Sequence, residues 1–289
     1  GQRPYYYTSI RGRSASELWV AGPFGQIWFY DGADGWTLVH DDNTESYEDL
    51  LITDAGLVVA AGKEMLITCG AHCAQPGSFS GPTRPGLLFK GLCARGETVY
   101  AVGSPQLTAR GILFRWSDNA WTELPLPTST PPLRTCLALE DGSLVLAGDL
   151  LHRRNADGTF VNEIVSPPFA VAPSAWTRLI EADGRTFIMG FQSRIAQRRP
   201  DGTWKPVYEP GNGGNGLHDA WPLGNGDILF VGSAPHPRIL LSGTTFTRFN
   251  GPPDFIAYGV WASDAAHHWL AGLRLGTTSS TAFVVDAVR

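Results

Sequence analysis

An apolar segment that ends in glycine recurs along the chain at nearly constant spacing. It reads ELWVAG, TVYAVG and ILFVGS at three of its occurrences. Its terminal glycines are Gly22, Gly62, Gly103, Gly148, Gly190, Gly232 and Gly272. Successive glycines are 40, 41, 45, 42, 42 and 40 residues apart. A fixed period of this length indicates a repeat architecture in which each unit is one supersecondary structure.

Every unit has the same internal order of apolar segments and turns. A short apolar segment precedes a polar turn, often Asp-Gly or Asn-Gly, as in EDGS and GNGD. These dipeptides favour tight hairpin turns because Gly and Asn tolerate positive φ. The glycine-ended segment follows, then a variable loop, a third apolar segment, and a polar turn that leads into Trp or Phe. Four short antiparallel strands per unit are typical of a propeller blade.

We therefore predict an all-β fold, a seven-bladed β-propeller of four-stranded antiparallel blades, as a single domain over residues 1–289. A β-sandwich has no reason for a sevenfold period, and no long segment has the 3.6-residue apolar spacing of a helical solenoid. The seventh unit is short, so its outer strand is either missing or supplied by the N-terminal residues. The repeat units are expected at about 5–46, 47–86, 87–131, 132–174, 175–215, 216–254 and 255–289.

The polar turn before the aromatic residue carries a family resemblance. It reads RPDGTW at 199–204 and NADGTF at 155–160, with a weaker copy, DGADGWT, at 31–37. This resembles the Asp-box turn, S-x-D-x-G-x-T-W, of the BNR propellers, and ELWVAG followed by GQIWFYDG resembles the repeat of the Ycf48-like propellers. The resemblance implies the fold and a structural turn on the rim, in which Trp204 fills the space between blades. It implies no activity, because such propellers include enzymes, lectins and assembly factors.

Composition excludes several classes of function. The net charge is −5, which argues against a nucleic-acid partner. No run approaches 18 apolar residues, so we expect no membrane span. The glycine-rich stretch GNGGNG at 211–216 is not followed by Gly-Lys-Ser/Thr and is not a phosphate-binding loop. We expect no cofactor and no metal.

The four cysteines leave alternatives open. Cys69 and Cys73 enclose Gly-Ala-His, which suits a short disulfide loop, although free thiols or a metal site are alternatives. Cys93 and Cys136 fall on the first strands of adjacent units, where we favour buried thiols over a bridge between blades. A disulfide would indicate an oxidising compartment.

Charged residues gather at the start of the first strand of each unit, although only 17% of the chain is charged. First strands line the channel of a propeller, so these residues are expected to surround one channel mouth. Arginine binds carboxylate or sulfate in a bidentate manner, which favours an anionic or polyhydroxylated ligand. Charged residues can also border a channel only because water fills it. The candidate ligand-binding residues are Glu48, Asp49, Lys90, Arg134, Arg178, His218, Asp219 and Tyr258.

Two classes of function fit this face. The first is a binding module, outside the cytoplasm of a bacterium, for a protein or carbohydrate ligand. The alternative is a carbohydrate-active enzyme at the same mouth, for which we assign no catalytic residues. A glycoside hydrolase needs two carboxyl groups about 5–10 Å apart, which Asp219 with Glu48 or Asp49 could supply.

A polysaccharide lyase would instead use His218 or Tyr258 as a base beside Arg178. A structural or assembly domain is a further alternative. We expect a monomer or one domain of a larger protein.

Overall fold

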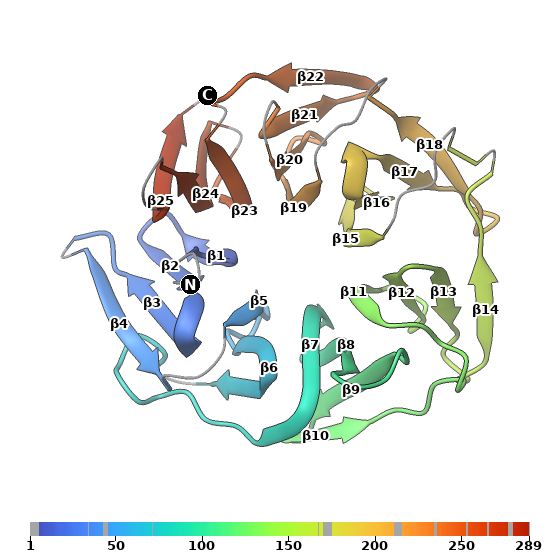
Figure 1. Cartoon of the computed structure of the whole chain (residues 1–289), viewed down its shortest axis with the longest axis horizontal. Helices are drawn as coiled ribbons and strands as arrows, with labels where there is room; N and C mark the ends of the chain where they lie inside the picture. The colour runs from blue at the N-terminus through green and yellow to red at the C-terminus, as the bar shows by residue number, and fades with distance from the viewer. Residues whose placement is uncertain are drawn as a thin grey trace.

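The computed structural model shows strands arranged radially around a central axis, with the first strand of each unit innermost (Figure 1). The structure describes residues 6–33, 35–42, 46–70, 72–166, 168–169, 175–210, 216–233, 236–252, 254–264, 266–276 and 280–288. Two short 3-10 segments, η1 (Pro23–Gly25) and η2 (Phe191–Ser193), follow the second strands of their units. Within these ranges no helix is long and apolar enough to cross a membrane.

The described strands form six antiparallel sheets. The first contains β1 (Ser9–Ser14), β2 (Glu17–Ala21), β3 (Gln26–Tyr30) and β4 (Trp36–Asp41). The second contains β5 (Tyr47–Ile52), β6 (Val58–Cys69), β7 (Thr83–Arg95), β8 (Thr98–Pro105), β9 (Ile112–Ser117) and β10 (Ala120–Glu123). The third contains β11 (Leu133–Ala138), β12 (Leu144–Gly148), β13 (Leu151–Arg154) and β14 (Phe160–Glu163).

The other three sheets follow the same inside-to-outside order. The fourth contains β15 (Trp176–Ala182), β16 (Arg185–Gly190), β17 (Ile195–Arg198) and β18 (Trp204–Tyr208). The fifth contains β19 (Leu217–Pro222), β20 (Ile228–Gly232), β21 (Arg238–Ser242) and β22 (Thr245–Phe249). The sixth contains β23 (Phe255–Ala262), β24 (His267–Leu275) and β25 (Ser280–Val288).

The prediction of an all-β propeller with four-stranded antiparallel blades is confirmed, but the predicted number of blades is wrong. The described residues form six blades, not seven, because β5–β10 share one sheet. β6 has 12 residues and continues beyond Gly62 as far as Cys69. This extension pairs with β7, Lys63 with Leu88 and Met65 with Thr83. The sequence period counts inner strands, and two of these, β5 and β7, lie in the same blade.

The sixth blade has three described strands, and β25 pairs with β24 along its whole length. The N-terminal residues extend the first blade, because the backbone N–H of Thr8 donates to the carbonyl of Ala21 at 3.0 Å. The described residues Tyr6–Thr8 therefore do not supply a closing strand to the sixth blade.

The recurring glycines have a common packing reason. In six of the seven units, the glycine pairs with the inner-strand residue just before a β-bulge. A Cβ at Gly103 would lie 1.9 Å from the carbonyl oxygen of Leu88, and one at Gly148 would lie 2.0 Å from that of Pro132. Only glycine allows the bulged backbone to approach so closely. Gly22 differs, because its Cβ would meet the ring of Tyr7 at 3.1 Å and the carbonyl oxygen of Gln26 at an ordinary 3.7 Å.

The Asp-box-like turns are structural, as the sequence predicts. Asp201 accepts hydrogen bonds from the backbone N–H and the hydroxyl of Thr203 at 2.9 and 2.7 Å. Asp157 and Thr159 repeat this geometry. Trp204 follows the turn and is fully buried, and its indole N–H donates to Glu163 of the preceding blade at 2.7 Å. The turn therefore places an aromatic side chain that joins two blades.

All four cysteines form disulfides. Cys69 and Cys73 close a short loop at the end of β6. The favoured interpretation of Cys93 and Cys136 as free buried thiols is wrong. These residues lie on β7 and β11, neighbouring inner strands of different blades, with Cα atoms 5.6 Å apart, and their sulfur atoms are bonded. This disulfide links two blades beside the channel.

Candidate functional site: the channel mouth

The bulges of the inner strands define two successive levels of residues around the channel. We call the residues just after the six bulges, together with Ser9 at the corresponding position of β1, the inner level: Ser9, Asp49, Gly91, Thr135, Arg178, Asp219 and Gly259. The residue before each of them forms a second set, which we call the mouth ring: Thr8, Glu48, Lys90, Arg134, Thr177, His218 and Tyr258. All seven residues of the mouth ring are half-buried. The candidate residues from the sequence are divided between these two levels.

Four polar side chains of the inner level each join their inner strand to the next one. In each case a side-chain oxygen accepts a hydrogen bond from a backbone N–H of the following inner strand. Asp49 accepts from Leu92 at 2.9 Å and Asp219 accepts from Val260 at 3.1 Å. The same contact is made by Ser9 with Leu50 and by Thr135 with Leu179. These side chains therefore have a structural role around the channel.

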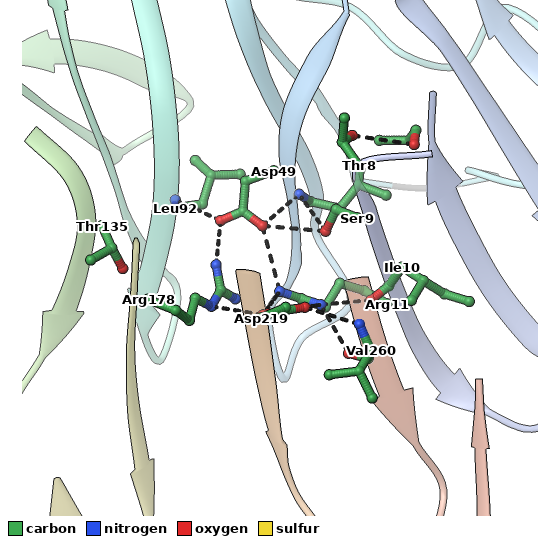
Figure 2. A network of polar contacts seen from close by, with 12 residues as sticks. Thr8, Ser9, Ile10, Arg11, Asp49, Leu92, Thr135, Arg178, Asp219 and Val260 are labelled. Atoms are coloured by element: carbon green, nitrogen blue, oxygen red, sulfur yellow. Dashed lines mark hydrogen bonds and ion pairs between the residues drawn. The ribbon is translucent and has the colours of Figure 1, made fainter. Parts of the chain in front are cut away.

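The charged residues of the inner level form a closed ion-pair network with Arg11 (Figure 2). Arg11 Nη1 lies 2.8 Å from Asp219 Oδ2, and its Nη2 lies 3.5 Å from Asp49 Oδ1. Arg178 Nη1 lies 2.7 Å from Asp49 Oδ2, and its Nε lies 3.1 Å from Asp219 Oδ1. The side chains of Arg11, Asp49 and Asp219 are only 5% exposed. Each carboxylate therefore contacts both guanidinium groups.

The network is held in its charged form. Burial alone would raise the pKa of Asp219, but the guanidinium groups of Arg11 and Arg178 outweigh burial and lower it. Burial alone would lower the pKa of Arg178, but Asp49 and Asp219 raise it. Two positive and two negative charges balance within the network. Asp49 and Asp219 are thus engaged with arginines and backbone N–H groups, and neither is a free carboxyl group facing a ligand.

Aromatic side chains cover one side of the mouth ring. The ring of Tyr258 lies 4.8 Å from that of His218 and 4.7 Å from that of Tyr6, measured between centroids. His218 Nε2 lies 3.0 Å from the hydroxyl oxygen of Ser233. Burial lowers the pKa of His218 to about 4, although the nearby Asp219 acts in the opposite direction. His218 is therefore neutral at pH 7.

Charged side chains continue the mouth ring on its other side. Lys90 Nζ lies 2.7 Å from Glu48 Oε1, so these two charges are paired. Arg134 has a different neighbour, because its guanidinium lies over the ring of Phe191 at 5.9 Å from the centroid. Its Nε is buried and has no hydrogen-bond partner among the described residues. Arg134 thus presents a guanidinium that is packed but not paired with an acid.

The structure brings the sequence candidates together in two groups. Asp49, Arg178 and Asp219 meet in the inner level, whereas Glu48, Lys90, Arg134, His218 and Tyr258 lie on the mouth ring.

Sequence reasoning missed Arg11, Tyr6 and Phe191. Arg11 lies two residues after the inner level, between apolar positions of β1, and Phe191 directly follows a strand-ending glycine. Trp176 and Trp261, on the inner strands β15 and β23, are buried in the blade cores. No three potential metal ligands cluster among the described residues.

The comparisons with known proteins agree with the class that the fold defines, a β-propeller. No protein-family model matches the chain, and no curated protein matches it. A catalytically inactive virginiamycin B lyase from Staphylococcus aureus, solved with quinupristin, is 14% identical with a TM-score of 0.74 over 94% of this chain and 93% of that one. YCF48 from Cyanidioschyzon merolae is 12% identical with a TM-score of 0.64 over 92% of each chain.

A third similar structure belongs to a longer protein. The extracellular domain of a hybrid two-component system from B. thetaiotaomicron is 15% identical with a TM-score of 0.69 over 94% of this chain and 37% of that chain. At these identities the likeness shows the fold alone.

Proposed function

We propose that this chain is an extracytoplasmic recognition propeller that binds a protein or glycan ligand at the mouth ring. The observation that carries the proposal is the division between the two levels. Asp49 and Asp219 are enclosed in ion pairs, whereas Arg134 has no acid partner among the described residues and lies on the same ring of half-buried residues as Tyr258, which packs against Tyr6. The mouth ring thus offers groups for binding a ligand, and the ion-paired inner level holds the strands beneath it in place.

The same contacts weigh against the enzyme alternatives. A glycoside hydrolase needs one protonated and one ionised carboxyl group facing the substrate. Asp49 and Asp219 face arginines, and Glu48 is paired with Lys90. A lyase built on His218 and Tyr258 would need Arg178 to neutralise the substrate, but Arg178 is bonded to both aspartates. Binding without turnover is the function that remains best supported.

Two observations support the proposed location. Both disulfides fit an oxidising compartment. One structurally similar chain is an extracellular domain. We further propose that residues 1–289 act as one domain, in which the sequence units 47–86 and 87–131 share the second sheet.

The test is a screen of the purified chain against immobilised glycans and against protein extracts. At least one of Arg134→Ala and Tyr258→Ala should weaken binding at least tenfold without changing the melting temperature by more than a few degrees. Lys205→Ala, which removes an exposed charge on the outer strand β18, serves as the matched control and should bind like the wild type. Glycan cleavage that disappears in His218→Ala would replace this proposal with the enzyme alternative.

A further inference from the structure

We infer that the ligand of the mouth ring is an acidic saccharide, whose carboxylate binds Arg134 and whose sugar rings lie against the aromatic side chains. This inference rests on the proposed function and narrows it to one class of ligand. Three features of the mouth ring carry it: an unpaired guanidinium, a local excess of positive charge, and a continuous series of aromatic rings.

The guanidinium of Arg134 is prepared for a planar anion. Its guanidinium carbon lies 5.9 Å from the centroid of the Phe191 ring, and its buried Nε lacks a hydrogen-bond partner in the described chain. Arg11 and Arg178, which lie deeper in the channel, are instead bonded to Asp49 and Asp219. A carboxylate can accept from two guanidinium N–H groups at once. Among the described residues no acid is paired with Arg134, so its guanidinium is available to a ligand carboxylate.

The mouth ring carries positive charge on a protein that is negative as a whole. The chain has a net charge of −5, and the four-residue network below the mouth ring is balanced. On the mouth ring itself, Glu48 offsets Lys90, which leaves Arg134 in excess. His218 adds no charge at pH 7 because its pKa is lowered to about 4. The mouth therefore favours an anion although the chain as a whole repels one.

Aromatic rings extend from Arg134 around the mouth. Phe191 contacts Arg134 and lies against Gly216, where an added Cβ would be 2.7 Å from the Phe191 ring and 3.5 Å from His218. The ring of His218 packs at a tilt against that of Tyr258, and the ring of Tyr258 packs at a tilt against that of Tyr6. Burial is the main cause that raises the pKa of both tyrosines, so their hydroxyl groups stay neutral donors. Flat ring faces beside hydroxyl donors match the C–H faces and hydroxyl groups of sugars.

The experiment measures calorimetric affinities of the whole chain for trimers of galacturonate and of mannuronate, and for the methyl esters of both. We expect at least one acidic trimer to bind at least tenfold more tightly than its ester. Arg134→Ala should weaken binding of the acid at least tenfold and leave the ester unchanged, so that the preference disappears. Arg134→Lys should keep part of the preference, because it restores the charge without the planar fork. Tyr258→Ala should weaken the acid and the ester together.

The possible results separate this inference from the proposed function. Equal binding of acid and ester, lost in Tyr258→Ala but not in Arg134→Ala, would show a neutral glycan and overturn the inference while the recognition function stands. If the chain captured only proteins and lost this binding in Tyr258→Ala, the ligand would be a protein. The inference would again be overturned while the recognition function stands. Binding of any kind that is unchanged in both variants would overturn the mouth ring as the site, and with it both proposals.

Discussion

The inner level and the mouth ring contain the same kinds of residue, but these residues have different roles in the two levels. Glu48 and Asp49 are consecutive on β5, and His218 and Asp219 are consecutive on β19. Asp49 is 5% exposed and held by two arginines, whereas Glu48 is 32% exposed and has one flexible partner. The charge of the residue just after the β-bulge therefore stabilises the channel, whereas the charge of the residue before it is placed to face a ligand.

The largest effect should follow from breaking the inner level at Asp219. Asp219→Ala removes the acceptor shared by Arg11, Arg178 and the backbone N–H of Val260. Loss of one partner from a buried ion pair costs about 3–5 kcal/mol, because the other charge stays buried. For a chain of this size we expect the melting temperature to fall by about 10 °C, measured by circular dichroism.

The matched control for this experiment is Glu48→Ala on the mouth ring. Its side chain is partly exposed, so its loss should cost less than about 1 kcal/mol. Similar losses for the two variants would contradict the distinction between the levels.

A smaller effect should follow from a methyl group at a bulge. In Gly103→Ala the new Cβ would meet the carbonyl oxygen of Leu88 at 1.9 Å, and the backbone on both sides would have to move. Overpacking of this kind costs about 1–3 kcal/mol. Gly22→Ala is the control from the same repeat position, because the nearest atom to its Cβ would be in the ring of Tyr7, at 3.1 Å. Urea unfolding should rank Gly103→Ala well below Gly22→Ala, and the reverse order would refute the packing reason for the glycine period.

The pH dependence of stability should reveal the neutral histidine of the mouth ring. The pKa of His218 is about 4 in the folded protein, below its ordinary value of 6.5. Between these values the unfolded chain binds more protons, so stability is fully present above pH 6.5 and is lost as the pH falls toward 4. Between pH 7 and pH 4.5 the loss is about 2 kcal/mol.

Urea unfolding of the wild type and of His218→Gln at pH 7 and pH 4.5 measures this loss. The stability advantage of the wild type should shrink by about that amount at the lower pH. A constant difference between the two proteins would show that His218 is not buried in its neutral form.

The fold was predictable where the physical cause is local. Tight turns need Asp-Gly or Asn-Gly, and the bulges need glycine on the second strand, so both produce a periodic pattern in the sequence. The number of blades was not predictable from that pattern. β6 continues through Gly62 instead of ending there, and its pairing with β7 depends on long-range contacts that no period records.

The candidate site was predictable as a set of positions but not as a set of roles. Alignment on the glycines finds the starts of the inner strands, yet a one-residue step across a bulge separates Glu48 from Asp49 in function. Arg11 was missed because it lies two residues further along β1 than the inner-level residue Ser9, deeper in the channel. The sequence placed Cys93 and Cys136 on the first strands of adjacent units, but the choice between free thiols and a bridge depended on their side chains meeting across two strands. Their separation of 43 residues is close to the repeat period and brings them to nearby positions of neighbouring inner strands.

The smallest effect on stability is expected from a substitution of Glu48, which should also increase binding. Glu48→Gln removes the partner of Lys90 but leaves a side chain of the same shape. Partly exposed ion pairs contribute about 0–1 kcal/mol, so the melting temperature should change by no more than about 2 °C. The freed Lys90 adds a second positive charge beside Arg134, and affinity for an acidic trimer should rise about threefold, with a steeper dependence on salt. If the variant lost stability as Asp219→Ala does, Glu48 would belong to the frame of the channel, and the mouth ring would not be a separate binding surface.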